Sequence, residues 1–277
     1  MAEPAVEVRG LWFGYGEGPP VLRGLDLTVA RGQIVALVGA NGSGKTTLCK
    51  HLNGLLRPRR GRVSVLGHDT AAASIGELAR QVGYLFQNPE QQIFSASVRR
   101  EIAFGPENLG LPAGEVQARV EGALARFELA ALAERPPSIL GYGVRRRITL
   151  ASLAAMDPPI LVLDEPTVGL DAAGLEEMVE WLGEVHARGR TILLVTHDMA
   201  LAARLAGRMI VLEAGCVLAD GPPADLFRRP EVMARASLAP PPVARLAGAL
   251  AAHGLPASAV TVEAFCEAYV AAVEGRA

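Results

Sequence analysis

A glycine-rich loop that directly follows a short apolar run is the feature that most constrains the fold. Residues Ile34–Val38 are all hydrophobic, and 39–46 read Gly-Ala-Asn-Gly-Ser-Gly-Lys-Thr. A loop of this composition between a strand and a helix points its backbone N–H groups at phosphates, and the helix dipole adds partial positive charge. A chance glycine-rich turn is the alternative, but every fixed position of the pattern agrees. We therefore predict a nucleotide site.

The residues of this loop and of the first helical turn are the predicted nucleotide ligands. Lys45 is expected to neutralise the outer phosphates, and the hydroxyl of Thr46 is expected to bind Mg²⁺. The full predicted set is Gly39, Asn41, Gly42, Ser43, Gly44, Lys45, Thr46 and Thr47.

Composition narrows the classes of protein that remain. The net charge of the 277 residues is −2, which argues against a nucleic-acid binder held by phosphate contacts. No segment is typical of a membrane span or of a secretory signal, so we expect a cytoplasmic location. The three cysteines, Cys49, Cys216 and Cys266, are widely spaced in apolar surroundings, and we expect buried, reduced thiols.

Hydrophobic patterning predicts an α/β chain with an inserted helical region. Alternation over 6–29 indicates antiparallel strands, whereas the apolar runs 159–163 and 191–195 are typical of parallel strands covered on both faces. Helices are expected over 47–56 and 175–188, and 88–157 is predicted to be mostly helical. A change to Ala and Pro after residue 221 suggests a boundary between a domain of 1–222 and an appendage of 223–277.

Two further strand ends carry polar residues. The run 161–163 ends on Asp164 and Glu165, where Asp164 can hold the Mg²⁺ shell and Glu165 can polarise the attacking water. A solvated turn is the alternative for these acids. His197 follows another strand and could contact the γ-phosphate, although a lone histidine there is more often structural. Gln87 could reach the metal or water through its amide, or could be a surface residue.

The order of these signals resembles the nucleotide-binding subunit of an ABC transporter over about the first 222 residues. The matching elements are the glycine-rich loop, Gln87, the helical insertion, Asp164-Glu165, the sequence Gly-Leu-Asp over 169–171 and His197. The resemblance implies a P-loop ABC ATPase fold with a parallel core sheet, an N-terminal antiparallel β subdomain, a helical subdomain and a small C-terminal appendage. It further implies ATP and Mg²⁺ as ligands and a D-loop role for Asp171. Tyr15 is expected to stack on adenine, with Phe13 as the competing candidate, and either could be core.

The stretches 87–94 and 102–110, with Val98 between them, look like the ATPases of energy-coupling-factor (ECF) importers, including the cobalt and nickel type. Such systems carry vitamins or metal ions inward. They combine two ATPases, a transmembrane coupling protein and a membrane substrate-binding protein, so the resemblance implies a peripheral location on the cytoplasmic face of the membrane. The appendage resembles their extra dimerisation segment. A non-transport ABC ATPase acting on a soluble complex is the alternative, but such proteins usually show two cassettes, a long coiled coil or basic stripes.

The signature loop departs from the family pattern Leu-Ser-Gly-Gly-Gln. This chain has Leu140, Gly141, Tyr142, Gly143 and Val144, so three of the five positions differ. Loss of one preorganised donor costs on the order of a hundredfold in rate, so a site closed by this loop should be weak. Because the other motifs are intact, we expect an asymmetric heterodimer in which a different ATPase subunit supplies a normal signature.

The sequence also predicts roles for two charged features near this loop. The run Arg145, Arg146 and Arg147 is expected to form the solvated face of the signature helix. Glu90 is expected to lie in a groove between the core and the helical insertion and to pair with a basic residue of the coupling protein. A helix-start acid favoured by the helix dipole is the alternative for Glu90.

Overall fold

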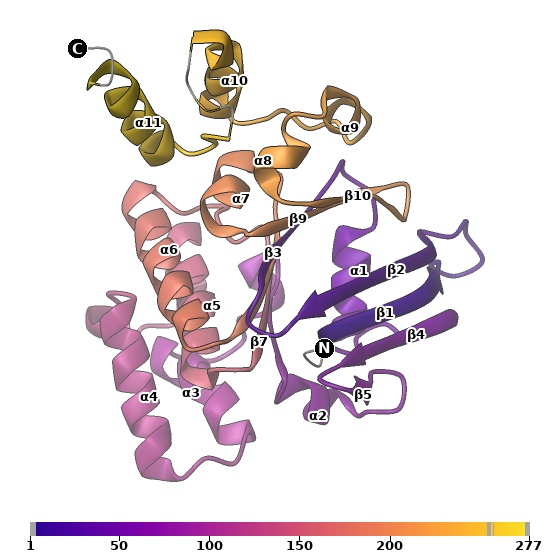
Figure 1. The fold of residues 1–277 in the computed structure, drawn as a ribbon. Helices are drawn as coiled ribbons and strands as arrows, with labels where there is room; N and C mark the ends of the chain where they lie inside the picture. Colours follow the sequence, from indigo (N-terminus) through magenta and orange to yellow (C-terminus); the bar gives the residue numbers. More distant parts are fainter. Residues whose placement is uncertain (1–3, 254–255, 257, 275–277) are drawn as a thin grey trace.

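The computed structural model of the protein describes residues 4–253, 256 and 258–274, and these form two β-sheets flanked by helices (Figure 1). The first sheet has four strands in the order β2-β1-β4-β5 and is antiparallel. Its alternation of buried and exposed residues explains the sequence pattern near the N-terminus. The strands are β1 (Pro4–Phe13), β2 (Leu22–Ala30), β4 (Arg60–Val65) and β5 (His68–Asp69).

The second sheet of the described residues has six strands in the order β10-β9-β3-β8-β7-β6. The pairs from β9 to β6 are parallel, and β10 adds an antiparallel edge that sequence analysis did not predict. Leu37 and Asp164 both pair with Val195, so the carboxyl ends of β3, β8 and β7 meet at one edge. The strands are β3 (Ile34–Val38), β6 (Val82–Leu85), β7 (Ile160–Asp164), β8 (Thr191–Val195), β9 (Arg208–Glu213) and β10 (Cys216–Gly221).

Helices cover the larger sheet from both sides (Figure 1). In the order of the chain they are α1 (Lys45–Leu52), α2 (Ile75–Ala79), α3 (Val98–Asn108), α4 (Ala113–Arg126), α5 (Tyr142–Met156), α6 (Ala172–Ala187), α7 (Met199–Leu205), α8 (Pro223–Leu226), α9 (Pro230–Arg235), α10 (Pro242–Ala249) and α11 (Val262–Glu274). Single 3₁₀ turns lie at Pro89–Gln91, Ala130–Leu132, Pro137–Ile139 and Ala251–His253.

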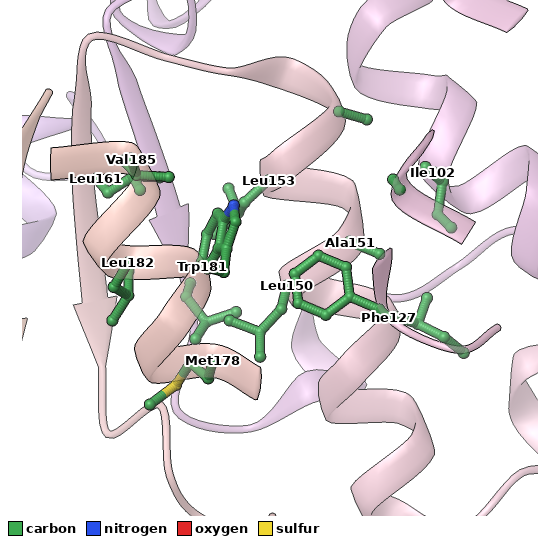
Figure 2. Close-up of a cluster of buried hydrophobic side chains, with 14 of the residues drawn as sticks. Ile102, Phe127, Leu150, Ala151, Leu153, Leu161, Met178, Trp181, Leu182 and Val185 are labelled. Carbon is green, nitrogen blue, oxygen red and sulfur yellow. The ribbon is translucent and has the colours of Figure 1, made fainter. Parts of the chain in front are cut away.

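Three apolar clusters hold these layers together. One packs the helices α3, α4, α5 and α6 on one face of the large sheet. Figure 2 shows part of it around Phe127 and Trp181. A second fills the space between the two sheets and includes Leu48 and Leu52 of α1. A third packs α7, α8 and α9 on β3 and β9. The helices that precede and follow β7 therefore share one core with the sheet.

Several predicted elements are confirmed and others are corrected. The N-terminal strands pair antiparallel, and the strand 191–195 has the predicted bounds. The helix after the glycine-rich loop ends at Leu52 rather than at residue 56, because Asn53 caps it and Gly54 leaves the helical region with φ 76°. The prediction of three buried thiols was wrong: Cys49 is buried, whereas Cys216, on the edge strand, and Cys266, on α11, are exposed.

The described residues contain no helix that is both long and apolar enough to cross a membrane. The boundary near residue 222 stays a prediction.

Replacing Phe127 by alanine should lower the stability of the full chain by about 3–5 kcal/mol. Phe127 is fully buried at the end of α4, and its ring meets that of Trp181 edge to face, with the centroids 5.6 Å apart. Truncation removes contacts between the helical insertion and α6, and it leaves a cavity. Urea unfolding measures the loss. Ile139→Ala is the control, because Ile139 is 66% exposed, and it should change stability by at most about 0.5 kcal/mol.

Candidate functional site

A cavity of about 220 Å³ lies where the carboxyl ends of the parallel strands meet. It brings together residues that are far apart in the sequence: the glycine-rich loop, the start of α1, Gln87 and the two acids that end β7. Its lining residues are Val21, Asn41, Gly42, Gly44, Lys45, Thr46, Thr47, Gln87, Asp164 and Glu165. Of these, only Val21 was absent from the predicted site, because it precedes β2 and shows no motif.

The loop between β3 and α1 has a backbone that only glycine can supply at its first position. Gly39 has φ 147°, and a Cβ there would lie 2.2 Å from the carbonyl oxygen of Leu212. The Lys45 ammonium donates to the carbonyl oxygens of Gly39 and Ala40 at 2.9 and 3.0 Å. Burial lowers the pKa of Lys45, and the nearby Glu165 and Asp164 carboxylates oppose that shift. A cation is thus held by loop carbonyl oxygens at a helix N-terminus, which is a site for anionic phosphate.

Thr46 and Asp164 meet at the floor of this cavity. The Thr46 hydroxyl donates to Asp164 Oδ2 at 2.7 Å, and the Tyr84 hydroxyl reaches the same oxygen at 3.3 Å. Burial of Tyr84, with the Cys49 and Asp164 groups nearby, raises its pKa, so its hydroxyl keeps its proton. Sequence analysis missed Tyr84. The signal available was its place in a strand, three residues before the polar residue Gln87.

This pair fits a magnesium ion that is completed by phosphate oxygens. Mg²⁺ prefers hydroxyl, carboxylate and water oxygens, and it commonly uses one or two protein groups together with substrate phosphates. Thr46 and Asp164 offer such oxygens beside the loop. Across the part of the chain that the structure describes, there is no cluster of three His, Cys, Asp or Glu side chains able to hold a metal alone.

Glu165 and His197 form the second polar contact of the site. His197 Nδ1 lies 2.8 Å from Glu165 Oε1, and the histidine side chain is 71% exposed. Glu165 has φ 49°, a left-handed conformation that costs a non-glycine residue about 1–2 kcal/mol. Its other oxygen, Oε2, is buried and has no hydrogen-bond partner among the described residues. One carboxylate oxygen of this cavity-lining residue therefore has unused acceptor capacity.

The two aromatic candidates for the adenine have different environments. Phe13 is buried, and its ring packs edge to face on both Tyr15 and His51, with centroids 5.0 and 4.7 Å away. Tyr15 is half exposed, and its hydroxyl lies 3.2 Å from Thr47 Oγ1. Tyr15 thus contacts Thr47, which lines the nucleotide cavity, whereas Phe13 belongs to the core.

The signature residues form the start of α5. Gly141 is the N-cap residue, while Leu140 and Val144 pack against the core of the helical insertion. Tyr142 is half-buried, and its hydroxyl donates to the carbonyl oxygen of Gln87 at 3.2 Å. The last signature position has therefore become an apolar packing position.

The prediction of a solvated arginine face was wrong for Arg146, which is fully buried. Residues at i, i+3, i+4 and i+7 share a helix face, and Arg146 lies on the same face as Thr149, Leu150 and Leu153, all of them buried. This helical spacing is the signal that could have identified it. Arg147 remains partly exposed and pairs with Glu128 at 3.5 Å.

Glu90 and Asp171 have partners within the chain. Glu90 Oε1 lies 3.3 Å from an Arg145 nitrogen, and the Glu90 side chain is more than half exposed. Asp171 caps α6, because its Oδ1 accepts a hydrogen bond from the Gly174 N–H at 2.8 Å. Neither residue lines the nucleotide cavity as described above, so their predicted roles concern surfaces outside it.

Comparison with known proteins agrees with this geometry. The family described as ABC transporter matches residues 22–168. An energy-coupling-factor transporter ATP-binding protein, EcfA, of Methanothermobacter thermautotrophicus is 40% identical over 90% of this chain and 81% of that protein. The nickel import ATP-binding protein NikO of Rhodobacter capsulatus is 45% identical over 86% of this chain and 96% of that protein. The chain spans 40% of the length of a putative ABC transporter ATP-binding protein of Methanosarcina acetivorans, with 42% identity.

Solved structures share the fold. The cbiO1 subunit of Clostridium perfringens, part of the ABC transporter complex cbiONQ, gives a TM-score of 0.72 at 34% identity, covering 84% of this chain and 94% of that one. A dimeric ATP-binding cassette in a post-hydrolysis state with ADP and phosphate gives a TM-score of 0.70 at 25% identity, covering 78% of this chain and 98% of that one. The chain therefore belongs to the ABC transporter family, among the ATP-hydrolysing subunits that include the energy-coupling-factor ATPases.

Proposed function

We propose that the chain is the ATP-hydrolysing half of an asymmetric ATPase pair in an ECF-type importer. In this role it couples ATP hydrolysis to uptake of a micronutrient, a vitamin or a transition-metal ion. The proposal includes a second, non-identical ABC ATPase, a transmembrane coupling protein and a membrane substrate-binding protein, with the chain bound peripherally on the cytoplasmic face. The names of the relatives EcfA and NikO support the importer class.

The observation that carries the proposal is the contrast between the two parts of the site. The residues that would surround a nucleotide within one chain converge on one cavity, and Glu165, whose Oε2 has no hydrogen-bond partner among the described residues, lines it. The loop that would contact the nucleotide of a partner chain lacks the usual serine, and its Tyr142 hydroxyl is bonded to Gln87 of the same chain. The nucleotide-binding residues within this chain are intact, whereas the loop that would contact the partner's nucleotide is altered. This contrast favours a pair of unlike subunits.

The proposed mechanism assigns each group by its position. Lys45 and the loop N–H groups bind the β- and γ-phosphates, and Tyr15 stacks on the adenine. Glu165 accepts a proton from the attacking water, while His197 holds its Oε1 in place. Gln87 orients the water or a metal ligand from the opposite wall. Magnesium held by Thr46 and Asp164 would neutralise charge that develops on the phosphates.

Replacing Glu165 by glutamine should lower ATP turnover by about a hundredfold or more and leave ATP binding intact. The amide keeps the size of the side chain but cannot accept the proton, and general bases contribute about 10²–10⁴-fold. Phosphate release from the assembled transporter and equilibrium ATP binding are the two measurements. Glu107→Gln, at an exposed acid on α3, is the matched control and should leave turnover unchanged. Turnover that survives in the Glu165 variant would contradict the assignment.

Replacing Thr46 by valine should weaken nucleotide binding only when Mg²⁺ is present. Valine has the shape of threonine but no hydroxyl, so Asp164 loses its 2.7 Å partner and the metal loses an oxygen ligand. Metal-site groups are typically worth about 10–100-fold in affinity, so we expect at least a tenfold loss. Calorimetric titration with ATP in magnesium and in EDTA separates the two contributions. Equal loss in both conditions would show that Thr46 acts on the phosphates or on the fold.

The purified chain alone should hydrolyse ATP about a hundredfold more slowly than the chain paired with an ABC ATPase of normal signature. A homodimer can close its sites only with the altered loop, which lacks a preorganised donor at Gly141. The Gly141→Ser change, which restores the missing hydroxyl, should raise the activity of the chain alone. Steady-state phosphate release at matched subunit concentrations tests both statements. Equal rates for the chain alone and for the pair would rule out the asymmetric arrangement.

A further inference from the structure

Arg146 is a fully buried guanidinium that bonds backbone carbonyls of two loops, one of which carries the cavity-lining Gln87. Its NH1 donates to Phe86 O at 2.7 Å, its NH2 donates to Gln87 O, and its Nε donates to Val168 O at 3.3 Å. Phe86 and Gln87 directly follow β6, and Val168 lies in the turn between β7 and α6. One side chain of α5 therefore links two loops that emerge from neighbouring strands.

Tyr142 lies one helical turn before Arg146 and contacts the same two loops. Its hydroxyl donates to Gln87 O at 3.2 Å and lies 3.5 Å from Arg146 NH2. Its ring packs on Gly169 so closely that a Cβ there would lie 2.2 Å from Tyr142 Cδ1. The carbonyl of Gln87 thus accepts from both α5 residues, and the tyrosine ring fills the space beside the turn.

The chemistry of Arg146 suits this linking position and no surface role. Burial lowers its pKa, and the nearby Tyr142 hydroxyl and the Asp164 and Glu165 carboxylates oppose that shift. A planar guanidinium can bond several carbonyls in fixed directions, whereas a lysine ammonium is a point charge on a flexible stem. Leaving a buried carbonyl without its donor costs free energy, so the bonded arrangement is strongly preferred.

We propose that Arg146 and Tyr142 are positioning residues that fix the backbone of Gln87, so that this segment and the start of α5 move as one unit. The proposal rests on the proposed function, in which Gln87 faces the bound nucleotide. The proposal assigns Tyr142, an altered signature residue, a positioning role within its own chain. A partner subunit that contacts the start of α5 would then change the position of Gln87 in this chain's own site.

Hydrogen exchange of the full chain without nucleotide tests the physical link directly. Arg146→Lys removes the fork and keeps the charge, and Tyr142→Phe removes one hydroxyl. We expect the peptide 85–94 to exchange about tenfold faster or more in Arg146→Lys, and a few-fold faster in Tyr142→Phe. Arg147→Lys is the matched control on the next residue and should leave that peptide unchanged. If Arg146→Lys does not fold, Tyr142→Phe alone decides.

Turnover of the variants in the assembled ATPase pair then separates positioning from a purely structural role. Both variants should lower kcat while the equilibrium affinity for ATP stays within about twofold of that of the unmodified chain, because ligand contacts are retained. Three results would each overturn the proposal. They are unchanged exchange at 85–94, unchanged kcat despite faster exchange, and a loss of ATP affinity as large as the loss of kcat. Failure of the proposed function is a distinct result, since the unmodified pair would then show no hydrolysis while the exchange comparison stays measurable.

Discussion

The parallel pairing of β3, β8 and β7 is the constraint on which the rest of the structure depends. Leu37 and Asp164 share Val195 as their register partner, so the ends of three strands are fixed within one sheet edge. The Thr46–Asp164 hydrogen bond and the His197–Glu165 contact both cross between these strand ends. A slip of one residue in either pairing would turn the acids to the other face of the sheet, so the chemistry of the site depends on the apolar strands.

The elements that could be predicted are those whose signal is local. The loop at 39–46 and the acids after 161–163 follow apolar runs, and buried parallel strands leave such runs in any sequence. The edge strand β10 carries no comparable signal, since it is antiparallel, half exposed and includes the exposed Cys216. Arg146 was missed for a different reason. Three consecutive arginines look solvated, and the helical spacing to the buried Thr149, Leu150 and Leu153 is what distinguishes Arg146 from its neighbours.

The altered signature loop is consistent with the packing around it. Val144 joins the core of the helical insertion, and Tyr142 covers Gly169 and bonds Gln87. Both side chains therefore have contacts within this chain that a small or amide side chain would lack. The changed positions form a connected arrangement, and loss of the usual serine at Gly141 accompanies new contacts to the adjacent loops.

Two costly features lie close to the nucleotide cavity. Glu165 has a left-handed backbone and a buried oxygen without a partner among the described residues, and Arg146 is a desolvated cation bonded to carbonyls. Each reduces stability unless surrounding contacts hold it, and such features concentrate where function requires a fixed geometry. Their charges are also opposite, and each lies within the electrostatic range of the other. The Asp164 and Glu165 carboxylates therefore favour the charged form of the buried arginine, and this links the turn after β7 to the segment after β6.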